Sequence, residues 1–130
     1  DAETLVRCRN QLKAYIDSGL ISDTVLMQYR RKLADVLQRL CIMQPDAVRY
    51  KFEYIENSIL IGKTGNVKEQ LGILEKEYPD DVRLYKLYVQ YYYFTNNGAG
   101  ISDVISKVKD RGIYLDSEGK QWFDAWNPNK

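Results

Sequence analysis

The chain has 130 residues, of which 45% are hydrophobic and 28% are charged, a balance typical of one globular domain that can bury roughly two thirds of its unfolded surface. Its 19 basic and 18 acidic residues leave a net charge of +1, which argues against nucleic acid or an anionic membrane as a partner. No apolar run approaches the roughly 18 to 20 residues of a membrane span, and no signal peptide is visible.

The first predicted helix runs from the N-terminal residues to a turn at 17–20. Apolar residues recur at helical spacing from Leu5 to Ile16, and the sequence "DSGL" then interrupts the pattern. Ser22 or Asp23 can accept a hydrogen bond from the backbone at the start of the next helix. These features predict a helical hairpin with a short turn.

Two further helices are predicted before the middle of the chain. From Val25 to Met43 the apolar residues step by three and four positions, which indicates a long amphipathic helix. Pro45 ends this helix, because proline disfavours helical backbone in the residue before it. A third helix is predicted from about 46 to 61, and its apolar stripe is Val48, Phe52, Ile55 and Ile59.

The second half of the chain also reads as helices. After a loop at 62–66, a shorter helix is predicted that ends at Tyr78 and Pro79, and the next helix runs up to about Thr95. A loop at 96–100 separates it from a further short helix, which Gly112 closes. A final helix is predicted at about 116–126. Since no alternating strand pattern of any length is present, the sequence predicts an all-α fold of about seven helices in antiparallel pairs.

Two stretches of the chain match each other at an offset of 34 residues. At the start of the two stretches, each residue of one set has an identical residue 34 positions later in the other. The first set is Pro45, Asp46, Val48, Arg49 and Tyr54, and the second is Pro79, Asp80, Val82, Arg83 and Tyr88. An apolar trio in the second helix occurs three times, as Leu33, Leu37 and Leu40, as Val67, Leu71 and Leu74, and as Ile101, Ile105 and Val108. A period of 34 residues carried by a helix, a loop and a second helix indicates an internal helical repeat.

This repeat resembles the tetratricopeptide repeat from Ala14 to about Gly112. The prolines that close each repeat, Pro45 and Pro79, match the pattern of that family, and Tyr92 matches its aromatic position in the first helix. The second helices open with larger apolar residues than the family favours, so the repeats are divergent.

The resemblance implies a right-handed α-α superhelix in a single domain of residues 1–130. Its helix pairs would be at about 2–43, 46–78 and 80–111, with a capping helix at about 116–126. Stacked pairs bury apolar faces that a single pair cannot bury, and at least about three are needed for stability. The last pair would be covered by Trp122, Phe123 and Trp126.

Five tyrosines and a phenylalanine lie within residues 79–94. An internal helix of a stacked array is contacted on several sides, so apolar residues occur around most of its circumference. Most of these rings are therefore expected to pack, with their hydroxyl groups at the rim of the core. Tyr93 is expected to line a groove instead.

The resemblance also implies protein–protein interaction, with a peptide or partner segment held in a concave groove. Projected onto this sequence, the lining residues are Arg49, Phe52, Glu56 and Ile59 from one helix and Arg83, Lys86, Gln90 and Tyr93 from the next. This basic and aromatic strip would suit an extended segment with acidic and apolar residues. One subgroup of the family binds a carboxylate-terminated chaperone tail with Lys, Arg and Asn. That partner is not expected here, because the corresponding places hold Phe52, Glu56 and Gln90, and Lys86 alone is of the right kind.

No catalytic or cofactor-binding residues are expected, and no cofactor. "GKT" at 62–64 lacks the glycine of a phosphate-binding loop five residues earlier, where Asn57 stands, and it follows a helix rather than a strand. Asp80 and Asp81 stand at the start of a helix, where they are expected to cap it. The chain contains no histidine, and no nucleophile in an enclosed pocket is indicated, so we expect no enzyme activity.

No metal site is expected, because two cysteines without histidine cannot form a zinc site within one chain. If the first hairpin turns near residue 20, the distances of Cys8 and Cys41 from the turn, measured along the helix axis, differ by about 13 Å. A disulfide needs Cα atoms within about 7 Å, so two reduced thiols that pack as small hydrophobes are expected. Reduced thiols are compatible with a cytoplasmic protein.

Several functions stay open at the level of the sequence. A non-catalytic module that binds a protein or peptide is the first, and the Asp at position 1 suggests a piece of a longer chain. The second is a regulatory or structural segment of a larger, possibly enzymatic, protein, packed on its own catalytic domain. RNA binding by helical repeats is the third, and the near-zero net charge argues against it.

The predicted second helix carries a basic face, which consists of Arg30, Arg31, Lys32 and Arg39. This face is either solvated or a site for an acidic partner.

Overall fold

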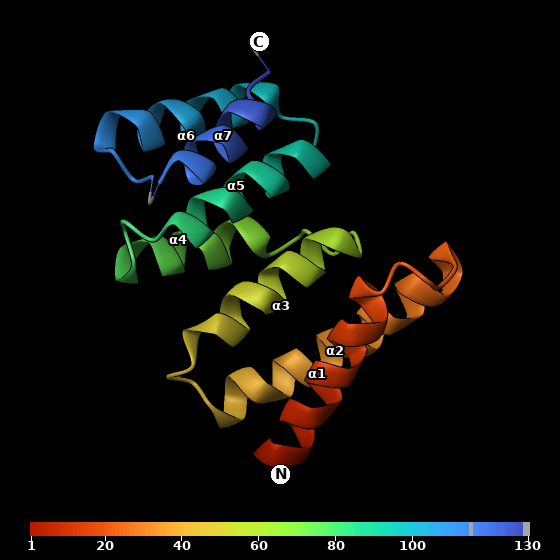
Figure 1. Ribbon diagram of the computed structural model, residues 1–130. Coiled ribbons are helices and arrows are strands. Elements are labelled where there is room, and N and C mark those ends of the chain that lie inside the picture. Colours follow the sequence, from red (N-terminus) through yellow and green to blue (C-terminus); the bar gives the residue numbers. More distant parts are fainter. Residues whose placement is uncertain (115, 129–130) are drawn as a thin grey trace. The chain divides into compact units, whose positions relative to one another are not determined.

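The computed structural model describes residues 1–114 and 116–128, and these residues form seven α-helices and no strand (Figure 1). The helices are α1 (Ala2–Asp17), α2 (Asp23–Met43), α3 (Val48–Leu60), α4 (Val67–Glu77), α5 (Val82–Phe94), α6 (Gly98–Arg111) and α7 (Ser117–Trp126). The predicted all-α fold is confirmed. No helix in the described part of the chain combines the length and the apolar character needed to span a bilayer.

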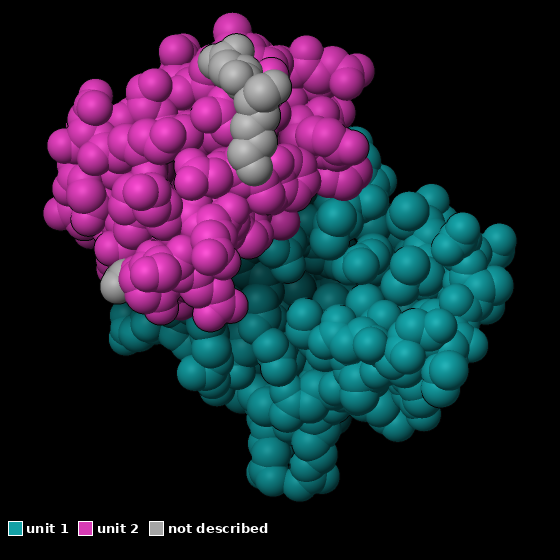
Figure 2. All heavy atoms as spheres, turned by 45° about the horizontal axis from the view of Figure 1, so that its top comes forward, with its two compact units in different colours: residues 1–63 teal, residues 64–130 magenta. Residues whose placement is uncertain are grey.

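The chain divides into two compact units, residues 1–63 and residues 64–130 (Figure 2). The first unit contains α1 to α3, and the second contains α4 to α7. The boundary falls between the two helices of the predicted pair 46–78, so that pair stays a prediction, and so does the single domain of residues 1–130.

The helix ends in the first unit follow local signals. Asp1 accepts a hydrogen bond from the backbone nitrogen of Thr4 at 2.8 Å, which caps α1. Ser22, one of the two caps that the sequence offered, caps α2 in the same way through the backbone nitrogen of Val25 at 3.3 Å. α2 ends at Met43, two residues before the proline that was expected to stop it.

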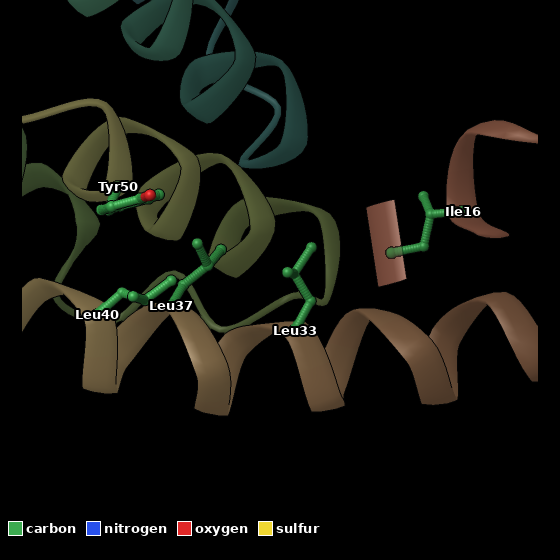
Figure 3. Close-up of a cluster of buried hydrophobic side chains, with 5 residues drawn as sticks. All are labelled: Ile16, Leu33, Leu37, Leu40 and Tyr50. Atoms are coloured by element: carbon green, nitrogen blue, oxygen red, sulfur yellow. The ribbon is translucent and has the colours of Figure 1, made fainter. Parts of the chain in front are cut away.

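The core of the first unit forms where α2 packs against both α1 and α3. Leu33, Leu37 and Leu40 project from α2 towards α3, which carries Tyr50 (Figure 3). Ile16 of α1 completes this buried cluster. The three leucines lie at spacings of four and three, so one face of α2 supplies all of them.

An ion pair also links α1 to α3. The Arg9 guanidinium meets the Glu53 carboxylate with two nitrogens, and the distance from Nε to Oε2 is 2.9 Å. The hydrogen bond and the charge of Glu53 raise the pKa of Arg9, although burial lowers it. Bidentate geometry of this kind fixes the relative position of two side chains better than a single contact does.

α5 is the central helix of the second unit, because it packs against both α4 and α6. Its buried residues are Leu84, Tyr85, Leu87 and Val89. α7 lies alongside α6 (Figure 1), and Phe123 of α7 is fully buried. An ion pair between Lys109 of α6 and Asp124 of α7, at 3.6 Å, adds a polar contact at the same place.

The apolar trio of the 34-residue repeat is buried in α2, α4 and α6 alike. No member of the three sets is more than 5% exposed, and the residues are Leu33, Leu37, Leu40, Val67, Leu71, Leu74, Ile101, Ile105 and Val108. The sequence period therefore coincides with a period of burial.

Residues 98–100, expected in a loop because of their glycines, are helical. Asn97 caps α6 by accepting a hydrogen bond from the backbone nitrogen of Gly100 at 2.9 Å, so α6 begins at Gly98. A capping side chain thus outweighs the low helix propensity of two glycines. At the other end, Gly112 adopts left-handed backbone with φ of 62° and closes α6, as predicted.

Replacing Leu71 by alanine is expected to lower the free energy of unfolding by about 2–5 kcal/mol, because it removes a fully buried leucine and leaves a cavity. Ile73→Ala is the matched control, since Ile73 lies on the same helix and is 53% exposed. Urea denaturation followed by circular dichroism measures both. Equal losses in the two variants would show that the assigned core face of α4 is wrong.

Candidate functional site

The residues predicted to line a groove fall into two sets that belong to different units. The set on α3 is Arg49, Phe52, Glu56 and Ile59, and the set on α5 is Arg83, Lys86, Gln90 and Tyr93. The continuous strip across both helices stays a prediction, and each set is considered within its own unit.

Two of the four α3 residues are not surface residues. Phe52 is 5% exposed and Ile59 is 1% exposed, so neither offers a face to a partner in this structure. The physical reason lies in their spacing, because with Ile55 they form one apolar stripe on the helix. Arg49 is exposed and donates a hydrogen bond to the Tyr50 hydroxyl at 2.9 Å, while Glu56 is half-buried.

On α5, the charge of Arg83 is compensated by its own helix cap. Two guanidinium nitrogens donate to the Asp81 carboxylate at 2.8 and 3.1 Å, and the Arg83 backbone nitrogen donates to it at 2.9 Å. The hydrogen bonds from the side chain hold the pKa of Asp81 below its ordinary value. The expected basic strip therefore loses one of its cations to a local ion pair.

The other predicted residues of α5 meet α7. The Lys86 ammonium lies 5.2 Å from the centre of the Trp122 ring, and Tyr93 packs edge-on against Trp126 with ring centres 4.9 Å apart. The side-chain oxygen of Gln90 is buried and has no hydrogen-bond partner among the described residues. The predicted lining of a groove on α5 is thus partly covered by α7.

At the C-terminal end of α5 the aromatic rings reach the surface. Tyr93 is 55% exposed and Phe94 is 47% exposed, with ring planes at 81° and centres 5.5 Å apart. They border a hollow of about 510 Å³, whose lining residues are Tyr92, Tyr93, Phe94, Asn96, Asn97, Gly98 and Ile101. We call this the aromatic hollow. Sequence analysis identified Tyr93 but missed Phe94, although an apolar residue at the end of a helix already lined with tyrosines was a usable signal.

A second cavity, of about 240 Å³, is lined by residues of α4, α5 and α6, and a row of Tyr85, Tyr88 and Tyr92 forms part of its lining. Neighbouring rings in this row are 6.3 and 6.2 Å apart. This volume is below the range of about 300–1,000 Å³ that is usual for small-molecule sites. The row therefore acts mainly as packing between the three helices, as the sequence predicted for most of the tyrosines.

Glu75, Tyr88 and Lys107, three of the polar residues that line this cavity, are paired with one another. Glu75 accepts a hydrogen bond from the Tyr88 hydroxyl at 2.8 Å and forms an ion pair with Lys107. Burial raises the pKa of Glu75, but the hydrogen bonds from Lys107 and Tyr88 outweigh burial, so the pKa lies below its ordinary value of 4.5. Burial and the Glu75 carboxylate both raise the pKa of Tyr88. This network links α4 to α5 and α6 and engages the Glu75 carboxylate.

The cysteines do not form a site. Both are free, and Cys8 is exposed, so the expectation that it packs as a small hydrophobe is wrong. Cys41 is half-buried, and burial raises the pKa of its thiol. Among the residues that the structure describes, no three histidine, cysteine, aspartate or glutamate side chains gather to hold a metal ion.

Comparison with protein-family models, with curated proteins and with solved structures finds no match for this chain. The function must therefore be argued from the surfaces and contacts described above. The aromatic hollow combines exposed rings with a recess of suitable size.

Gly100→Ala is expected to destabilise the fold by about 1–3 kcal/mol, because the added Cβ would stand 2.7 Å from the Tyr92 ring and force that ring to move. Gly98→Ala, in the same first turn of α6, meets no atom within 4 Å and is expected to change stability by less than about 0.5 kcal/mol. Thermal unfolding of both variants tests this. A neutral Gly100→Ala would contradict the close approach of the Tyr92 ring.

The lowered pKa of Glu75 predicts a loss of stability in acid. Its carboxylate contributes stability above the ordinary pKa of 4.5, and this contribution is lost as the pH falls through the depressed pKa of the folded state. Glu75→Gln should therefore show a smaller drop in thermal midpoint between pH 6 and pH 3 than the parent chain. Glu69→Gln, an exposed position on the same helix, should keep the parental drop. Identical profiles for Glu75→Gln and the parent would contradict the ion pair.

Proposed function

We propose that the chain is a divergent member of the tetratricopeptide-repeat type, with helix pairs related by the 34-residue period. The helices α3 and α5 support this, since both have 13 residues and begin 34 positions apart, at Val48 and Val82. The burial of the apolar trio in α2, α4 and α6 supports it further. A superhelix is the arrangement that such repeats would form.

We further propose that the chain is a non-catalytic protein–protein interaction module, and that a partner segment contacts the aromatic hollow. The observation that carries this proposal is the exposure of Tyr93 and Phe94 beside a recess of about 510 Å³. Exposed aromatic rings are enriched in protein interfaces and commonly supply much of the binding energy. Rings that were needed only for the core would be covered, as Tyr85 is at 1% exposure.

The polar chemistry of the second unit also favours a binding role over a catalytic one. A catalytic carboxylate needs an environment that keeps it available to a substrate. Glu75 is instead held by Tyr88 and Lys107, and Asp81 is held by Arg83. These pairs serve the packing and capping of helices.

Replacing both Tyr93 and Phe94 by alanine is expected to weaken partner binding at least about ten-fold, while the chain stays folded because both residues are about half exposed. The partner is first recovered by affinity capture with the parent chain, and its affinity is then measured in purified form by calorimetry. Tyr78→Ala, which alters an exposed tyrosine at the end of α4, is the matched control and should bind normally.

Two outcomes would contradict the proposal. If the double variant binds as tightly as the parent, the partner contacts another surface, and the basic face of α2 is the next place to test. If the double variant unfolds, the two rings are structural.

A further inference from the structure

The solvent-facing side of α2 carries three exposed cations, Arg31, Lys32 and Arg39. The buried leucines of α2 point to the opposite side, towards α3 (Figure 3). Arg30, the fourth cation of the basic face, stands three residues before Leu33 on the packed side and is half-buried. We call the exposed set of Arg31, Lys32 and Arg39 the outer strip of α2.

The cations of the outer strip form no ion pair within residues 1–114 and 116–128, the part of the chain that the structure describes. The Lys32 ammonium lies 5.6 Å from the centre of the Tyr29 ring. Asp35, also exposed, lies one turn from each arginine and pairs with neither. By contrast, Arg9 on α1 is held by Glu53. On this side of α2, three cations therefore outnumber one carboxylate.

The charge and the hydrogen-bonding capacity of the outer strip both select an acidic partner. Lysine and arginine side chains donate hydrogen bonds and accept none, so a partner must supply acceptors. Carboxylates supply acceptors together with the opposite charge, and arginine binds them with two parallel hydrogen bonds. Arg31 and Arg39 stand about 12 Å apart along the helix axis, which matches carboxylates two turns apart on a helical segment lying along α2.

Apolar side chains adjoin the outer strip at the C-terminal end of α2. Ile42, one turn after Arg39, is 75% exposed, and Met43 is 50% exposed. Methionine and arginine are both enriched in protein interfaces, whereas recognition of anionic lipid uses clusters of about four to eight lysines and arginines. Nucleic acid is disfavoured by the net charge of +1. The occupant that fits is therefore a protein segment with both acidic and apolar residues.

We propose that the outer strip of α2 binds an acidic, amphipathic helical segment of a partner protein. Its carboxylates would meet Arg31 and Arg39, and its apolar side chains would cover Ile42 and Met43. This surface lies on another helix than the aromatic hollow and goes beyond the function proposed for that hollow.

The test uses the full chain and a capped amphipathic peptide of glutamate and leucine, with an otherwise identical peptide of glutamine and leucine as the uncharged control. Calorimetry measures both affinities at low and at physiological salt. The glutamate peptide is expected to bind at least about ten-fold more tightly than the glutamine peptide at low salt, and salt should reduce this difference because the contacts are exposed. Polyuridine and vesicles containing phosphatidylserine are the competing polyanions, and both are expected to bind more weakly than the glutamate peptide.

Charge reversal locates the binding surface. Lys32→Glu combined with Arg39→Glu should weaken binding of the glutamate peptide at least about ten-fold, and the chain should stay folded because both side chains are exposed. Lys63→Glu combined with Lys120→Glu is the matched control, since it changes the net charge equally at exposed positions elsewhere. This control should lose no more than about two-fold in affinity.

A further pair of variants tests the apolar contact. Ile42→Ala should weaken binding of the glutamate peptide at least about three-fold, because it removes exposed apolar surface beside Arg39. Leu20→Ala, at a position 89% exposed in the turn before α2, should bind like the parent. Thermal midpoints of all variants confirm that each is folded.

The proposal is overturned if the glutamine peptide binds as tightly as the glutamate peptide, or if the charge reversal in the outer strip costs no more affinity than its matched control. Tighter binding of polyuridine or of the vesicles through the outer strip would also overturn it, because the partner would then be that polyanion. The proposed function is tested separately, since Tyr93→Ala combined with Phe94→Ala should leave the affinity for the glutamate peptide unchanged. A partner that depends on Tyr93 and Phe94 but not on the outer strip would refute this inference and leave the aromatic hollow as the binding surface.

Discussion

The packing of α5 against α4, α6 and α7 is the constraint on which the rest of residues 64–130 depends. A helix with neighbours on several sides must be apolar around most of its circumference, and α5 meets this need with a mixture of aliphatic and tyrosine side chains. Leu84 and Val89 are fully buried, while the tyrosine row fills the space between α4 and α6. In the last turn of α5 the helix is only partly covered, and there Tyr93 and Phe94 reach the surface.

Tyrosine serves two purposes on this one helix because its ring is apolar and its hydroxyl group is polar. Tyr85 and Tyr88 keep their rings in the interior and give their hydroxyl groups to partners on other segments, the Pro79 carbonyl and the Glu75 carboxylate. Tyr93 has the same chemistry but lies at the edge of the packed region, so more than half of it faces solvent. Position on the helix, rather than residue type, separates structural tyrosines from those available for binding.

The helices of the first unit are held together mainly by aliphatic side chains and by a few polar contacts. Leucines of α2 fill the space towards α1 and α3, and the Arg9–Glu53 ion pair joins the two outer helices directly. Asn57 is buried on α3 and donates a hydrogen bond to the backbone oxygen of Arg30 at 2.6 Å, which ties α3 to α2. Buried polar contacts of this kind specify one relative placement of two helices where apolar packing alone is more permissive.

The sequence by itself determined the all-α class, several helix ends and the burial of the apolar trio, although it placed the start of α6 in a loop. The signals for these features lie within a few residues of one another, such as the Ser22 cap and the left-handed turn at Gly112. Only the tertiary structure decided which candidate site residues reach the surface. Phe52 is buried and Arg83 is neutralised by Asp81, while Tyr93 stays exposed beside α7. Periodicity tells which residues share a face of a helix, but whether that face is covered depends on side chains that are distant in sequence.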